Sequence, residues 1–379
     1  MQADPAPDAP QPLVQIYGTL VPFTEYGHTT GATRPGAVGA SEVSPMAYTG
    51  INAPARSRME VGTSDLGFRG GIDLTDNLAV VWQLESGLQL DGSTVPNTNT
   101  IASRNTHLGL KGPWGTAIVG TWDTPYKWAT LITVNPIAAG FTPDYTGILS
   151  NPGFGVSAVT IQTGRVNAAP DAAFERRQGN SIQYWSPLFL TGLSVRLAYS
   201  IDEGRTATTP TAPSIKPSLF SGWLGYDNGP LRLRYTLEAH LDYFGMSQLG
   251  GSPGDTNTNR SSTDVGQRFL AQYIHATPGF DTRVLGIFEY LSYKNDDTNM
   301  NAIDGHSRAA YYGLVEQTLF GKHHVWVAFG QALDGSCSFV SGAPCSTAGL
   351  GATDAVLGYI YRFSKDIDFF AAAYRITNK

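Results

Sequence analysis

The segment Leu231–Phe244 constrains the fold more than any other part of the sequence, because its apolar and polar side chains alternate almost without a break. Such alternation is the pattern of a β-strand with one apolar and one polar face. Globular strands usually have roughly five or six residues, whereas a tilted strand that crosses a bilayer needs about 9 to 11. The polar face carries Arg232, Arg234, Thr236, Glu238, His240 and Asp242. So many charges are costly in a packed core, so we expect this face to meet water and the other face to meet lipid. A long, half-exposed strand of a soluble sandwich is the alternative.

A bilayer crossing by this chain would have to use β-strands. No apolar run approaches the ~20 residues that a transmembrane helix needs, and Phe369–Tyr374 is typical of the longest. A closed β-barrel is the only other structure that pairs all of its backbone groups in lipid. Charged residues make up 15% of the chain, below the roughly 25% of soluble domains. The net charge of −6 and the absence of a basic run argue against a nucleic-acid partner.

Fifteen segments have the composition and alternation of strands, namely 13–22, 58–72, 78–90, 104–112, 115–122, 178–186, 192–201, 218–226, 231–244, 266–275, 281–294, 307–319, 323–333, 354–363 and 367–376. The connections between them alternate in length. The short ones are 73–77, 112–115, 187–191, 227–230, 276–280, 320–322 and 364–366. The long ones are rich in Gly, Asn, Ser and Thr, namely 23–57, 91–103, 123–177, 202–217, 245–265, 295–306 and 334–353. This segregation is typical of an up-and-down outer-membrane barrel and has no reason to occur in a sandwich.

The expected domain organisation is a single barrel over residues 13–379, preceded by a disordered N-terminus at 1–12. Residues 1–12 have no charged start and no apolar centre, so they are not a signal peptide. Fifteen strands are one fewer than the even number expected of an antiparallel single-chain barrel. Either a further strand lies within 123–177, for example at Val156–Thr163, or the chain stops one strand early. We favour the second interpretation.

Several sequence motifs follow one another along nearly the whole chain. They are Val14–Gly18, Ser64–Gly70, Ala79–Gly87, His107–Gly112 with Trp114–Thr116, Asn180–Pro187 and Tyr361–Lys365. In this order they resemble the strands of the trimeric general porins of Gram-negative bacteria. The resemblance implies an all-β transmembrane antiparallel barrel of sixteen strands that forms a homotrimer in the outer membrane. It further implies passive diffusion of small hydrophilic solutes and ions, with no cofactor and no chemical turnover.

The sequence departs from this family at three places. The family's last strand ends in an aromatic residue, whereas this chain ends Ile-Thr-Asn-Lys379, which agrees with an absent closing strand. Asp65 stands where the family has a pore-lining Arg, and Thr121 stands where Gly-Arg-Gln follows the fifth strand. The arginine ladder of the family is therefore thinned, and its frequent anion preference does not carry over.

The resemblance places the loop that narrows the pore at 123–177. Between Thr124 and Pro170 its only carboxylate is Asp144, which we expect to face basic residues of the wall; a turn residue after Pro143 is the alternative. Strand parity and the resemblance give the other pore-lining candidates, namely Asp65, Arg69, Glu85, Arg104, Arg177, Arg196, Arg232, Arg234 and Glu238. Arg104 rests on the resemblance, because simple parity turns it outward. Opposed rows of Arg and Asp/Glu side chains create a transverse electric field that orients solutes in a pore. Each pair is equally explained as a structural salt bridge on the solvated wall of the barrel.

Three weaker groupings remain. Cys337 and Cys345 share one Gly/Ser-rich loop and are expected to form a disulfide, since a second pair of metal ligands is missing. Asp296, Asp297 and Asp304 are calcium candidates, although Ala302 and Arg308 replace the Gly and Glu of an EF-hand loop. His323 and His324 fit a solvated turn better than a metal site.

We conclude from the sequence that this is an outer-membrane diffusion channel, with two rivals. A barrel enzyme would need a Ser/His/acid set at one rim. His240 and Asp242 point into the expected lumen, but no nucleophile motif accompanies them. A secreted β-rich adhesin would explain the long loops without a pore.

Overall fold

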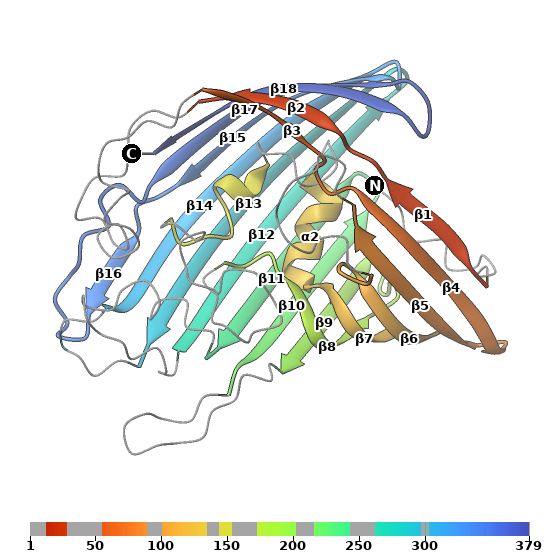
Figure 1. Ribbon diagram of the computed structural model, residues 1–379, viewed down its shortest axis with the longest axis horizontal. Helices are drawn as coiled ribbons and strands as arrows, with labels where there is room; N and C mark the ends of the chain where they lie inside the picture. The colour runs from red at the N-terminus through yellow and green to blue at the C-terminus, as the bar shows by residue number, and fades with distance from the viewer. Residues whose placement is uncertain are drawn as a thin grey trace.

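The computed structural model describes residues 13–28, 55–88, 101–134, 144–153, 173–201, 216–242, 262–296, 300 and 303–378. Within these ranges the chain is almost entirely β-structure (Figure 1). The strands are β1 (Gln15–Thr19), β2 (Phe23–Gly27), β3 (Arg56–Glu60), β4 (Asp65–Thr75), β5 (Leu78–Gly87), β6 (Thr106–Gly112), β7 (Gly115–Asp123), β8 (Arg177–Trp185), β9 (Leu193–Ile201), β10 (Ser218–Asn228), β11 (Leu231–Leu241), β12 (Ser262–Thr277), β13 (Phe280–Asn295), β14 (Ile303–Leu319), β15 (His323–Ala332), β16 (Ser336–Phe339), β17 (Ala352–Arg362) and β18 (Asp368–Asn378). The helices are α2 (Pro125–Val134) and the 3₁₀ helix η2 (Tyr145–Gly147). None of the described helices is long and apolar enough to cross a membrane.

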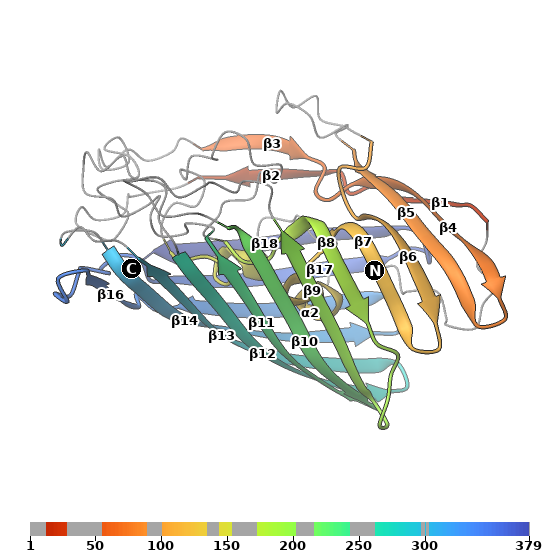
Figure 2. The ribbon, with the colours of Figure 1, turned by 90° about the horizontal axis from the view of Figure 1, so that it is seen from below.

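One antiparallel sheet contains nearly all of these strands, and each strand pairs with its neighbours in the order of the chain. The path runs β1, β4 to β15, β17 and β18, which is fifteen strands, and β16 pairs at its side with β14. These fifteen correspond one to one with the fifteen predicted segments, so the up-and-down antiparallel fold is confirmed. The sheet curls so that β17 and β18 pass behind β10 and β11, with α2 on the inside (Figure 2).

The first two predicted strands are each interrupted, which the sequence analysis missed. Segment 13–22 ends as β1 at Thr19, and segment 58–72 divides into β3 and β4, while β2 and β3 form a separate ribbon. The interruption is fixed by Ser64, whose Oγ accepts from the backbone N of Val21 at 2.9 Å and donates to the carbonyl of Val61 at 2.5 Å. Gly62 beside it has φ of 49°, a left-handed conformation that suits glycine.

The ribbon of β2 and β3 leans toward β18, the last strand of the sheet. The rings of Phe23 and Phe370 lie 6.1 Å apart, and the Tyr374 hydroxyl donates to Glu25. By the alternation of the path, β1 and β18 run in the same direction, and no ladder joins them in the described part of the chain. The alternative strand at 156–163 lies outside the described residues.

Burial confirms the predicted direction of the two faces of β11. Glu238 is fully buried and Arg234 is 4% exposed, whereas Tyr235 is 43% exposed on the opposite face. The strand is shorter than predicted, because Asp242 leaves it with φ of 57°. The same outward apolar face continues round the sheet through Leu84, Leu108, Val119, Ile182, Leu197, Phe220, Phe269, Val284, Phe288, Tyr311, Val315, Val327, Phe329 and Leu357. The outer surface of the sheet is therefore apolar, as a membrane barrel requires.

The inner face is less uniformly polar than the sequence analysis expected. Strands β12 to β17 also turn apolar side chains inward, including Leu270, Leu285, Leu314 and Trp326. Tyr145, Ile148 and Leu149, which come from the long connection between β7 and β8, belong to the same packed cluster. The described parts of the predicted loop 123–177 that include these residues thus pack against the inner face of the sheet. The loop also contains α2 and η2, which were not predicted.

Candidate functional site

The long connection between β7 and β8 is held inside the barrel by a buried ion pair. Arg268 of β12 and Glu289 of β13 lie directly opposite each other in the sheet. The Arg268 Nε and Nη2 donate to Glu289 Oε2 at 3.0 and 2.5 Å, and both side chains are buried. Charge-assisted hydrogen bonds of this kind are strong, but they leave a costly unpaired charge if one partner is removed.

Three parts of the connection converge on this pair. From α2, the Tyr126 hydroxyl donates to Glu289 Oε2 at 2.7 Å. The backbone N of Ser150 donates to Glu289 Oε1 at 2.6 Å, and Arg268 Nη2 donates to the Ser150 hydroxyl at 2.5 Å. Arg268 Nη1 contacts Glu175, just before β8. We call Arg268 and Glu289, with Tyr126, Ser150 and Glu175, the loop anchor.

A ring stack supports the loop anchor. Phe174 stacks on His240 of β11 with ring centroids 4.5 Å apart, and the Tyr126 ring lies tilted at 5.6 Å from the Phe174 ring. His240 is buried and its Nε2 lies 2.9 Å from Glu238 Oε1. This is where the structure places the candidates Glu238 and His240: both belong to the packed wall beside the loop.

The candidates near β4 and β5 form one group. Arg104 Nε donates to Glu85 Oε1 at 2.7 Å, and its Nη2 lies 3.9 Å from Asp65. Arg104 therefore faces inward, and the parity argument that turned it outward was wrong because β6 begins only at Thr106. Arg69 lies beside this group, where its Nε donates to Gln15 and its guanidinium covers the Tyr17 ring at 4.9 Å.

Arg177 belongs to a second group, at the root of the loop. Its Nε donates to Asn105 Oδ1 at 2.7 Å and lies 3.4 Å from Asp123 Oδ1. Lys127 of α2 pairs with the same carboxylate at 2.9 Å. The wall and the first turn of α2 are thus joined by one carboxylate with two cations.

The candidates on β9 and β11 are separate from these groups. Arg196 lies between Trp185 and Trp223 across three strands, and its guanidinium is 4.9 and 4.7 Å from their rings. Arg234 pairs with Asp227 at 2.7 Å, and the more exposed Arg232 lies 3.7 Å from the same residue. The structure therefore distributes the candidates over the wall and does not gather them at one place.

Asp144 caps the short helix η2. Its Oδ1 accepts from the backbone N of Thr146 at 2.8 Å and from the Thr146 hydroxyl. Burial raises the pKa of this carboxyl above its usual value, and the hydrogen bonds of Thr146 oppose that rise. Asp144 makes no ion pair with a basic residue of the described chain. Its contacts are those expected of a turn residue after Pro143, which was the alternative to an acid that faces basic residues of the wall.

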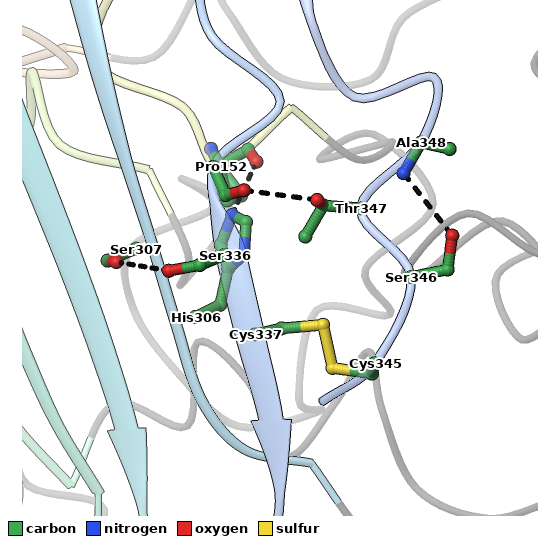
Figure 3. Close-up of a disulfide and its surroundings, with 10 residues drawn as sticks. Pro152, His306, Ser307, Ser336, Cys337, Cys345, Ser346, Thr347 and Ala348 are labelled. Atoms are coloured by element: carbon green, nitrogen blue, oxygen red, sulfur yellow. Dashed lines mark hydrogen bonds between the residues drawn. A yellow bond between two sulfur atoms is a disulfide. The ribbon is translucent and has the colours of Figure 1, made fainter. Parts of the chain in front are cut away.

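The remaining groupings are simple. The structure joins Cys337 and Cys345 in a disulfide, with Cα atoms 5.3 Å apart (Figure 3). His323 Nδ1 lies 2.8 Å from the Tyr359 hydroxyl, and His324 Nδ1 lies 2.9 Å from Glu316. Asp297 is outside the described residues. The described residues of the chain contain no group of three or more His, Cys, Asp or Glu side chains placed to hold a metal.

Sequence reasoning missed the loop anchor, although a signal for it was present. Arg268 is the single charge within predicted strand 266–275, and Glu289 is the charge nearest the middle of predicted strand 281–294. Both of these strands carry apolar and polar side chains on each face, so parity could not say which way the charges point. Their pairing depends on strand register, which the sequence does not fix here.

A curled antiparallel sheet with an apolar outer belt, ion pairs inside and a loop anchored within it defines a β-barrel of the outer-membrane type. A sequence profile of the Gram-negative porin family matches residues 6–379, and the chain belongs to this family. This membership places it in the bacterial outer membrane.

Individual relatives are more distant. The major outer membrane protein P.IB of Neisseria gonorrhoeae is 37% identical over 78 residues, which are 19% of this chain and 21% of that protein's own length. An anion-selective porin from Comamonas acidovorans has a similar structure, with a TM-score of 0.62 and 19% identity over 97% of this chain and 89% of that one. The trimer form of OmpT, an outer membrane protein of Vibrio cholerae, has a TM-score of 0.57 with 12% identity over 96% and 88% of the two chains. At these identities the structures share the fold.

Proposed function

We propose that this protein is a passive diffusion channel for small hydrophilic solutes and ions. The observation that carries the proposal is the loop anchor, which fixes a long connection inside a barrel that is apolar outside. A loop held in the lumen narrows it and sets a size limit, while the charged wall acts on the solutes that pass. The proposal agrees with family membership and needs no energy source and no moving part.

We further propose that the channel has weak ion selectivity. The inward arginines are mostly paired with acids of the wall: Arg104 with Glu85, Arg177 with Asp123, Arg234 with Asp227 and Arg283 with Glu316, besides the loop anchor. Paired charges present a smaller net field to a passing ion than a row of free arginines does. The neighbour from Comamonas acidovorans is described as anion-selective, and we expect this chain to be less so.

We propose a homotrimer that turns over no substrate. The trimer rests on the original resemblance and on a trimeric structural neighbour. The rival enzyme lacks available groups: His240 is buried under Phe174, and Asp242 accepts hydrogen bonds from the backbone N of Lys216 and Ser262 at 2.8 and 3.2 Å.

Single-channel recording tests the channel, its weak selectivity and the trimer. Purified protein added to a planar bilayer should produce stable conductance steps that close in groups of three. Under a salt gradient the reversal potential should stay near zero. Well-folded protein that produces no steps would refute the channel, and a large reversal potential would refute the weak selectivity alone.

A further inference from the structure

The segment of the inward loop that contributes Ser150 to the loop anchor has a second attachment, which is made by other residues of the wall. Arg308 of β14 donates from Nη2 to the carbonyl of Ile148 at 2.6 Å. Two residues earlier on the same strand face, His306 Nε2 lies 3.0 Å from the carbonyl of Pro152. Both wall side chains are buried. The segment 148–153, which we call the loop tip, is therefore fixed to β14 through its backbone.

The surroundings of Arg308 are unusual for a buried cation. Its other hydrogen bond goes from Nη1 to the carbonyl of Leu350 at 3.4 Å, and its Nε has no hydrogen-bond partner among the residues that the structure describes. Arg308 makes no ion pair with any acid of the described chain. Glu289 acts on it electrostatically, but the oxygens of Glu289 are taken by Arg268, Tyr126 and Ser150. A buried guanidinium that is satisfied mainly by carbonyls is costly, so packing stability alone is a poor reason for it.

Arg308 joins two loops that are far apart in the sequence. Ile148 belongs to the inward loop, and Leu350 lies near the end of the connection 333–351 between β15 and β17, which contains the disulfide. The two loops approach closely at Arg308: Gly153 has φ of 90°, and a Cβ there would collide with Arg308 Nη1 and the carbonyl of Leu350. Only a residue without a side chain fits between them.

The disulfide-closed segment is itself bound to the wall and to the inward loop. Its strand β16 pairs with β14, and Cys337 lies opposite His306 (Figure 3). Leu350 is buried in one cluster with Tyr126 of the loop anchor and with Phe174, and both cysteines pack against that cluster. A bond that closes segment 337–345 restricts its freedom and so favours this arrangement.

We propose that Arg308 is a positioning residue, which ties the loop tip to the disulfide-closed segment and thereby sets how far the tip narrows the pore. The inference rests on the proposed channel function. It assigns the disulfide a part in permeation. The Cys337–Cys345 bond holds Leu350 in place, and the carbonyls of Leu350 and Ile148 accept hydrogen bonds from one guanidinium. The position of Leu350 thereby determines the position of the loop tip. Loss of either the guanidinium or the disulfide should release the same contact.

The test compares wild type, Arg308→Met and Arg308→Lys, each before and after dithiothreitol. The reagent's two thiols supply the two electrons and two protons that convert the disulfide to two thiols, and the reagent becomes a cyclic disulfide. Arg362→Met is the matched control, because Arg362 is half-exposed and pairs with Asp368 at the opposite rim. The readouts are single-channel conductance and the rate at which liposomes take up a tetrasaccharide relative to a disaccharide.

We expect Arg308→Met to raise the conductance and the relative uptake of the larger sugar, with a smaller rise for Arg308→Lys, whose single ammonium has no fork to span two carbonyls. Reduction should raise both readouts in wild type and in Arg362→Met, but add little in Arg308→Met. Unchanged readouts in a folded Arg308→Met variant, or additive effects of mutation and reduction, would overturn the proposal. If the variant does not fold, reduction of wild-type channels already inserted decides, and no change then refutes it. Absence of any wild-type channel would instead refute the proposed function.

Discussion

Glu175 shows how much a single residue of the inward loop is constrained. Its φ of 69° is left-handed, which is uncommon for a side chain with a Cβ, and such strain persists only where surrounding contacts maintain it. The contacts are Arg268 and the Tyr145 hydroxyl, which donates to Glu175 Oε2 at 3.2 Å. Burial raises the pKa of the Glu175 carboxyl to about 7, although Arg268 opposes the rise.

This pKa predicts a pH dependence of the docked loop. An undocked Glu175 has the ordinary pKa near 4.5, so the docked loop holds the proton more tightly and is destabilised as pH rises from that value through about 7. We expect open-channel current fluctuations to be small at pH 5 and larger at pH 8. The Glu175→Gln variant should show small current fluctuations at both pH values, because the amide side chain stays neutral and still accepts a hydrogen bond from Arg268. Fluctuations that decrease on raising the pH would contradict this reasoning.

Asp144 allows a charge to be removed with its hydrogen bond retained. Asn is as good a cap as Asp, so Asp144→Asn should keep the bond from the Thr146 backbone N and the shape of η2. If the carboxylate acts on passing ions, the reversal potential should move toward anion selectivity at pH 8. The difference from wild type should shrink in acid, because the raised pKa means that the carboxyl is protonated earlier than usual. Identical reversal potentials at pH 8 would leave Asp144 with the capping role alone.

At the residue level, the sequence was informative where strands have one apolar face. Parity placed Glu85, Arg196, Arg234 and Glu238 on the inner side, and the structure has them there. It failed for Arg104, which precedes its strand. Strand parity gave no prediction for Arg268 and Arg308, because both residues contact a loop whose path cannot be predicted from a local sequence pattern.

The helix α2 is the element that sequence reasoning could have found. Thr124 and Pro125 begin it, and a Thr cap followed by Pro at the first position is a helix start signal. The Thr124 carbonyl accepts from the backbone N of Trp128 at 2.8 Å, as the first turn requires. The helix lies against β9 to β12, so its side chains reach the inner wall where the loop anchor is. Its location needed the tertiary structure.

The loop anchor predicts a large loss of stability on truncation. Arg268→Leu leaves Glu289 buried without its cation, which should cost about 3–5 kcal/mol. The measurement is urea unfolding of the protein in detergent micelles, followed by tryptophan fluorescence. The double variant Arg268→Leu with Glu289→Met should recover part of the loss, because it leaves no unpaired charge. A single variant as stable as wild type would show that the pair does not hold the loop.

For the whole molecule, the order of the strands in the sheet could be predicted from alternation and loop length, whereas the breaks in the first strands could not. Each strand was found because its outer face is apolar, and strand order in an up-and-down sheet follows the chain. The breaks between β1 and β2 and between β3 and β4 depend on one hydroxyl, that of Ser64. Such a local contact leaves no periodic signal in a sequence.

The outer belt carries the most general prediction, since every other inference assumes that this face meets lipid. Val327 of β15 is 52% exposed and lies between Val315 and Leu357, both outward and apolar. Val327→Lys should destabilise the protein in lipid vesicles by about 2–4 kcal/mol, as for a charge near the bilayer midplane. Val327→Leu should be nearly neutral, and Gln331→Lys, on the same face but near the strand end, should cost only about 0–1 kcal/mol. Urea unfolding in vesicles measures all three. If the two lysine variants lose equal stability, the face has no dependence on depth and the belt does not lie in a bilayer.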